Sequence, residues 1–186
     1  FVNTPDILTD YLQFGGRAGY KVRAAIAATG SPTWGVYAGY ELVENVARAG
    51  SEENIDNEKY EFKHREWAKA EAAGLSLAPY ITALNRARAA HPALQQLRGL
   101  QTHWSDDDAI LVYSKHVDAA FTENARPDTV TVGIVQMFAN GEIHCRFDES
   151  VRGTDVFIVQ THSAADGSTL NDALMDQLGA ALLAFD

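Results

Sequence analysis

The sequence predicts a mixed α/β fold: the last βα units of a (β/α)8 barrel, then a β-hairpin in a β-rich segment, then a terminal βα unit. Three observations predict it. Helical and strand-like segments alternate over residues 1–100, period-two apolar patterns mark strands after residue 100, and one apolar stripe marks a helix near the end. With 186 residues, 46% of them hydrophobic, the chain is long enough to bury a core. We expect three parts, at residues 1–100, 101–135 and 136–186.

The first residues predict two helices and a strand. Thr4, Pro5 and Asp6 have the order of a helix start, with Thr4 as the cap, Pro5 in the first helical position and Asp6 beside the positive end of the dipole. The alanine-rich residues 17–29 predict a second helix. Residues 34–37 have the composition of a strand.

The middle of the chain predicts a long loop and a third major helix. Residues 48–72 are polar and without strict period, which indicates a loop with a short helix near residues 65–72. A capped helix begins at Ser76 and stops at His91. A hairpin is predicted with strands at residues 101–104 and 109–114. Three further strands are predicted at residues 129–135, 143–147 and 156–159, and a last helix at residues 170–183.

Charge and cysteine content exclude several classes of protein. Lys and Arg total 15 against 25 Asp and Glu, a formal charge of −10, so we expect no nucleic-acid partner. Apolar stretches are shorter than the ~20 residues of a membrane span and no signal segment is visible, which predicts a cytoplasmic protein without a membrane partner. Cys145 is the only cysteine, which excludes an internal disulfide and a thiolate metal cluster within one chain, and we expect no metal site. The chain starts with Phe1 rather than Met, which indicates a processed piece or an excised fragment.

Five segments resemble consecutive landmarks of one enzyme family. They read FVNTPDILTDYLQFGG, SPTWGVYAGYELVEN, NEKYEF, SLAPYITALNRARAAHPALQQLR and DDDAILVYSK. Over about residues 1–130 the chain is similar to the C-terminal part of the α-1,4-glucan:maltose-1-phosphate maltosyltransferases, relatives of α-amylase. The resemblance implies a glycosyltransferase of glycogen biosynthesis. Its (β/α)8 barrel would carry an Asp nucleophile, a Glu general acid and a third Asp, which together retain anomeric configuration by double displacement.

This resemblance implies three site residues. Asp6, in NTPD, would be the third carboxylate, which orients the sugar and stabilises the oxocarbenium-like transition state. Lys59 and Tyr60, in NEKYEF, would contact the donor sugar. Each also has a plainer interpretation, because an Asp in a first helical turn needs no catalytic role and a Lys-Tyr pair in a polar loop is commonly solvated surface. Glu41 would close a Tyr-x-Gly-x-Glu corner with a more structural role.

The resemblance also implies partners. The substrates would be α-glucan and maltose 1-phosphate, no cofactor would be needed, and the full-length family enzyme would be a homodimer. The nucleophile and the general acid belong to earlier barrel strands, so we expect this chain alone not to transfer maltosyl units. Barrel strands without their neighbours would leave unpaired backbone groups and an exposed apolar face.

A second resemblance begins near Met137. The runs FANGEIHCRFDESVRGTDVFIVQTHS and LNDALMDQL are similar to the N-terminal domain of ribose-phosphate pyrophosphokinase. It implies that Phe138, Asn140 and Glu142 hold the adenine of ATP, with Mg²⁺ accompanying the nucleotide. The alternative is that Asn140 and Gly141 form a simple hairpin turn. The catalytic lysine and arginine of that family, and its ribose-phosphate loop, do not follow.

Two incomplete resemblances in one chain indicate a fusion, a composite or an artificial chain, and they leave three functions open. The first is a fragment of a glucan-extending glycosyltransferase. The second is a nucleotide-binding piece of the pyrophosphokinase. The third is a catalytically silent globular or interaction domain. Binding of maltose or of ATP with Mg²⁺ would separate the first two.

Overall fold

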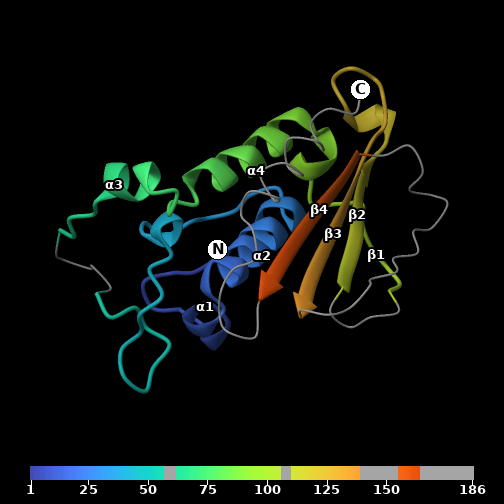
Figure 1. Ribbon diagram of the computed structural model, residues 1–186. Helices are drawn as coiled ribbons and strands as arrows, with labels where there is room; N and C mark the ends of the chain where they lie inside the picture. The colour runs from blue at the N-terminus through green and yellow to red at the C-terminus, as the bar shows by residue number, and fades with distance from the viewer. Residues whose placement is uncertain (57–61, 106–109, 139–154, 164–186) are drawn as a thin grey trace. The chain divides into compact units, whose positions relative to one another are not determined.

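The computed structural model describes residues 1–56, 62–105, 110–138 and 155–163 (Figure 1). The chain forms two compact units. Unit 1 contains residues 1–28 and 33–86, and unit 2 contains residues 29–32 and those from 87 onward. Helices and loops make up unit 1, whereas unit 2 contains a sheet. This mixture of helices and strands confirms the α/β class.

The predicted second and third helices are confirmed. Helix α2 spans Gly16–Gly30 and helix α4 spans Ala78–Ala90. Ser76 caps α4 as predicted, since its Oγ accepts a hydrogen bond from the Ala78 backbone N–H at 3.1 Å. The short helix expected in the long loop is α3, Trp67–Ala72. A 3-10 helix, η1, spans Tyr40–Leu42.

The start predicted for the first helix is wrong. Thr4 and Ile7 exchange two backbone hydrogen bonds, at 3.1 and 3.2 Å, which close a tight turn with Asp6 at its exposed tip. Helix α1, Asp10–Phe14, begins only after this turn. The cause lies fifty residues away, because the Asn54 side-chain amide donates to the carbonyl oxygens of Thr4, at 2.9 Å, and of the next residue. Those carbonyls are the acceptors that a helix from Thr4 would need.

The strand predicted at residues 34–37 is also wrong. The N–H of Val2 donates to the carbonyl oxygen of Gly35 at 3.0 Å, and no ladder of such bonds continues along the segment. Strand composition alone does not make a strand, because a strand needs a neighbour along its length. No extended strand occurs among the described residues of unit 1, so the barrel units stay a prediction.

Unit 2 has a four-stranded sheet in the order β1-β2-β3-β4. The strands are β1 Leu100–His103, β2 Ile110–Val117, β3 Asp128–Phe138 and β4 Asp155–Ser163. Strands β1, β2 and β3 pair antiparallel, and β4 pairs parallel to β3. The predicted hairpin is therefore confirmed, with Leu100 opposite Lys115. Two 3-10 helices, η2 Pro92–Gln95 and η3 Ala119–Phe121, flank the first two strands. The strand predicted at 143–147 and the helix predicted at 170–183 lie outside the described residues.

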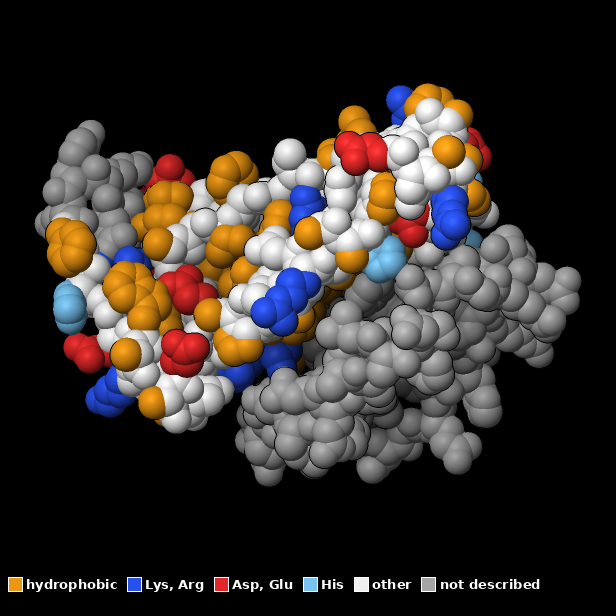
Figure 2. Space-filling view, turned by 90° about the horizontal axis from the view of Figure 1, so that it is seen from above, with side chains coloured by type: hydrophobic (Ala, Val, Ile, Leu, Met, Phe, Trp, Pro, Cys, Tyr) orange, Lys and Arg blue, Asp and Glu red, His pale blue; other side chains and the backbone are white. Residues whose placement is uncertain are grey.

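Each unit has its own buried apolar core. The fully buried large side chains of unit 1 include those of Val2, Leu8, Leu12, Tyr20, Tyr40 and Leu77. Those of unit 2 include Leu94, Val117, Val130 and Val132. Many other large apolar side chains stay at the surface, where Figure 2 shows them between acidic and basic ones. Among the described residues, no helix combines the length and the apolar character needed to cross a bilayer.

Candidate functional site

The Tyr-Ala-Gly-Tyr-Glu corner at residues 37–41 is built around Gly39. This glycine has φ +99°, and its N–H donates to Oε2 of Glu41 at 3.1 Å. The other oxygen of Glu41 accepts the indole N–H of Trp67. A Cβ on Gly39 would lie 2.2 Å from Oε2 of Glu44. Glycine is favoured at this position, because the positive φ strains any residue with a Cβ and a Cβ would displace the Glu44 carboxylate.

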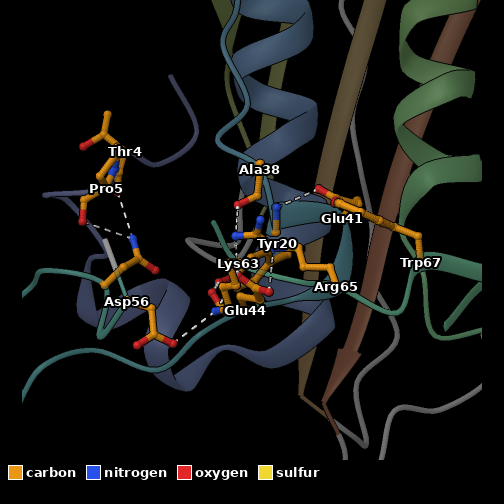
Figure 3. A network of polar contacts seen from close by, with 12 residues as sticks. Thr4, Pro5, Tyr20, Ala38, Glu41, Glu44, Asp56, Lys63, Arg65 and Trp67 are labelled. Atoms are coloured by element: carbon orange, nitrogen blue, oxygen red, sulfur yellow. Dashed lines mark hydrogen bonds and ion pairs between the residues drawn. The ribbon is translucent and has the colours of Figure 1, made fainter. Parts of the chain in front are cut away.

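Glu44 is the centre of a charged network in unit 1 (Figure 3). Arg65 donates Nε to Oε1 at 2.9 Å and Nη2 to Oε2 at 3.1 Å, the bidentate geometry of a strong pair. Lys63 adds a third bond, from Nζ to Oε2, at 3.2 Å. The Arg65 side chain is only 5% exposed, and its Nη2 also donates to the carbonyl oxygen of Ala38 at 3.1 Å. Two cations therefore fix one carboxylate next to the Gly39 corner.

Two buried tyrosines support the network through the backbone. The Tyr20 hydroxyl donates to the backbone carbonyl of Glu44 at 2.6 Å, and the Tyr40 hydroxyl donates to the carbonyl of Tyr20 at 2.6 Å. Their rings lie 4.5 Å apart. Burial raises the pKa of both phenols well above the ordinary value, and the charge of Glu44 raises that of Tyr20 further. Both hydroxyls consequently stay protonated and act as donors.

The segment that carries Lys59 and Tyr60 begins and ends at this network. These two residues lie outside the described residues, but the positions around them are described. Asp56, before the segment, pairs with Lys63, after it, at 3.4 Å (Figure 3). The N–H of Ile55 donates to the carbonyl of Val46 at 3.0 Å, which holds the incoming stretch of chain. The base of the segment is thus closed by an ion pair that also contacts Glu44.

Asn54 joins the base of that segment to the turn of Asp6. Its side chain is buried and donates to the carbonyls on the N-terminal side of Asp6, as described above. A second link is the Leu8 N–H, which donates to the carbonyl of Glu52 at 2.5 Å. The structure therefore brings together the turn of Asp6 and the base of the segment with Lys59 and Tyr60.

The residues of the second resemblance are only partly described. Phe138 is the last residue of β3 and lies opposite Ser163 of β4 in the parallel register. Asn140 and Glu142 lie outside the described residues. A nucleotide site at these positions stays a prediction.

Sequence reasoning missed the central pair of the network, Glu44 and Arg65. The two residues are 21 positions apart and lie in segments without helical or strand period. The one available signal is charge, since acidic Glu44 and Asp56 precede basic Lys63 and Arg65 around the NEKYEF segment. Opposite charges pair with one another here, so the network can hold a loop in place.

No cluster able to hold a metal ion occurs in the described part of the chain.

Several curated proteins are similar to this chain over 62–64% of its length. It is 56% identical over 118 residues to α-1,4-glucan:maltose-1-phosphate maltosyltransferase 2 of Streptomyces coelicolor, 63% of this chain and 18% of that protein. It is 58% identical over 120 residues to the maltosyltransferase of Corynebacterium glutamicum, 64% of this chain and 18% of that protein. It is 55% identical over 116 residues to the α-1,4-glucan:maltose-1-phosphate maltosyltransferase of Mycobacterium tuberculosis. The matched residues are 62% of this chain and 16% of that protein. The chain thus spans less than a fifth of the length of these curated relatives.

A further match is to a different family. Residues 124–182 match the N-terminal domain of ribose phosphate pyrophosphokinase. Both resemblances stated from the sequence are therefore confirmed: the chain is similar to maltose-1-phosphate maltosyltransferases over about 63% of its length and to the pyrophosphokinase domain near its C-terminal end.

Proposed function

We propose that this chain is a fragment of an α-glucan-extending maltosyltransferase and supplies part of the site for maltose 1-phosphate. The observation that carries the proposal is the identity of 55–58% to enzymes of that name over about 116–120 residues. The geometry of unit 1 supports it, because Asn54 ties the turn of Asp6 to the base of the segment with Lys59 and Tyr60.

In this proposal Asp6 acts on the transition state. Its carboxylate lies at the tip of a turn that two backbone hydrogen bonds and Asn54 hold in place. A negative charge held rigidly beside the sugar ring stabilises positive charge that develops at the anomeric carbon, without reorganisation during the reaction. Lys59 and Tyr60 contact the donor sugar. The charged network around Glu44 acts indirectly, since it fixes the base of their segment.

One carboxylate does not complete the reaction. Double displacement needs a nucleophile that forms the glycosyl-enzyme bond and an acid that protonates the leaving group, in addition to a stabilising carboxylate. The 186 residues by themselves are therefore proposed to bind sugar without transferring maltosyl units.

Isothermal titration calorimetry tests this function. Maltose, maltose 1-phosphate and a linear α-1,4-oligoglucan are titrated into the chain, with the β-linked disaccharide cellobiose as the matched control. We expect heat of binding with the α-linked sugars and none with cellobiose. An absence of heat with every α-linked sugar, from a chain shown to be folded by circular dichroism, would overturn the proposal.

A second candidate function is nucleotide binding at the C-terminal end. The match of residues 124–182 to the pyrophosphokinase domain favours it. Phe138, Asn140 and Glu142 would then hold the adenine of ATP, with Mg²⁺ on the phosphates. Titration of ATP with Mg²⁺ into the chain and into Phe138→Ala separates the candidates, because binding lost in the variant supports a nucleotide site and absence of heat in both contradicts it.

A further inference from the structure

The side-chain oxygen of Asn3 is buried without a hydrogen bond. The residue is 4% exposed, and its Oδ1 has no partner among the residues that the structure describes. Buried side-chain polar atoms nearly always have a partner, because an unpaired polar atom away from water is destabilising. An exception three residues from Asp6 calls for an explanation.

The position of Asn3 is set on both sides by backbone contacts. On one side, the N–H of Val2 donates to the carbonyl of Gly35 at 3.0 Å. On the other, the N–H of Thr4 donates to the carbonyl of Ile7 at 3.1 Å. The fold therefore holds the backbone on both sides of Asn3 while its amide oxygen has no partner among the described residues, an arrangement that is unfavourable unless another group supplies a donor.

The chemistry of this turn suits a polyol. An amide offers one acceptor oxygen and two N–H donors, whereas the carboxylate of Asp6 only accepts. A sugar hydroxyl both donates and accepts, so neighbouring hydroxyls can satisfy an amide and a carboxylate at once. An apolar ligand, by contrast, would leave the amide oxygen unpaired.

We propose that Asn3 is a sugar-binding residue whose amide oxygen accepts a hydrogen bond from a hydroxyl of the sugar held at the turn of Asp6. This inference rests on the proposed function and adds Asn3 to the proposed sugar site. Because Oδ1 is inaccessible in the unliganded chain, the sugar must draw the amide outward, and the new hydrogen bond favours that movement. The unpaired oxygen thus destabilises the unliganded chain and favours the bound one.

The variant Asn3→Leu tests both halves of the inference, because leucine has nearly the same shape and no polar atom. Without ligand, its Tm should rise by about 2–4 °C, since an unpaired buried group is removed. Its affinity for maltose, measured by calorimetry, should fall about tenfold or more. Asn3→Ala, which cannot overpack the site, should lose the same affinity.

The matched control is Asn45→Leu in the same unit. The amide of Asn45 has a partner, since Nδ2 donates to the carbonyl of Gln13 at 2.9 Å. This variant should lose stability and keep wild-type maltose affinity.

The inference on Asn3 fails if wild-type protein binds maltose and Asn3→Leu binds it equally well, whatever its Tm. It also fails if Asn3→Leu is less stable than wild type, because the amide oxygen then has a stabilising partner without sugar. A wild-type chain that binds no α-linked sugar overturns the proposed function, and the inference with it.

Discussion

The contacts that stabilise unit 1 internally differ in kind from those that stabilise unit 2 internally. In unit 2, antiparallel strands repeat the same backbone pairing along β1, β2 and β3, and apolar side chains such as Val112 and Val132 fill its core. In unit 1, single long-range contacts hold loops, such as those of Arg65 with Glu44 and of Asn54 with the turn of Asp6. A ladder distributes stability over many equivalent bonds, whereas a loop network concentrates it in a few residues.

The largest expected effect is that of Arg65→Ala. Removing one partner of a buried ion pair leaves a carboxylate partly uncompensated, which costs about 3 kcal/mol of the free energy of unfolding of unit 1. Chemical denaturation followed by the fluorescence of Trp34 and Trp67, with Trp104 replaced by Phe, reports on this unit. The converse background, in which only Trp104 remains, should show an unchanged midpoint for unit 2. Equal losses in both units would contradict the distinction between them.

Gly39→Ala tests whether a single backbone position also contributes strongly to the stability of unit 1. Its positive φ costs about 1–2 kcal/mol for a residue with a Cβ, and the clash with Oε2 of Glu44 adds to this cost, so we expect a total of about 2–3 kcal/mol. Gly50→Ala is the matched control, because Gly50 also has a positive φ, of +72°, but nothing lies within 4 Å of the place that a Cβ would take. Its cost should be about 1 kcal/mol. Equal costs, measured by urea denaturation, would show that Glu44 does not restrict this position.

The stability of the two units should depend differently on pH in alkaline solution. The pKa values of Tyr20 and Tyr40 are raised by burial, so the folded state holds their protons more tightly than the unfolded state. Their stabilisation is present below pH 10 and declines above it, by roughly 1 kcal/mol per tyrosine from pH 10 to pH 11. In unit 2, burial raises the pKa of Tyr113 but lowers that of Lys115. As the pH rises, the tyrosine therefore decreases the stability of unit 2 while the lysine increases it.

The measurement is the urea midpoint of each unit between pH 8 and pH 11, read from the tryptophans as above. Unit 1 should lose stability more steeply than unit 2, and Tyr20→Phe should make its decline shallower. A steeper decline in unit 2 would contradict the conclusion that the buried Tyr20 and Tyr40 make unit 1 the more sensitive to alkali.

The smallest expected effect is that of Arg48→Ala. Arg48 and Glu53 form an ion pair at 3.2 Å, but their side chains are 51% and 43% exposed. Water and salt screen such a pair, so its loss should change the free energy of unfolding by less than about 1 kcal/mol. A loss as large as that of Arg65→Ala would mean that exposure does not decide which ion pairs stabilise unit 1.

The same contrast explains which features could be predicted from the sequence. Local periods predicted α2, α4, β2 and β3, because each of these elements follows from its own residues. The helix start at Thr4 was mispredicted because Asn54, fifty positions later, takes the carbonyls at the turn. The Glu44 and Arg65 pair was missed for the same reason, since its partners are 21 positions apart. For the candidate site, the resemblance supplied Asp6, Lys59 and Tyr60, and the structure supplied the contacts that bring the turn and the segment base together.

The most direct test of the proposed sugar site is titration of maltose into the wild-type chain and into Asp6→Asn. The amide keeps the shape of the carboxylate and removes its charge, so the Tm should stay close to that of wild type. A charge-assisted hydrogen bond contributes about 1.5–3 kcal/mol, which predicts about a tenfold or greater loss of affinity. Wild-type affinity in Asp6→Asn would contradict the placement of the sugar at this turn.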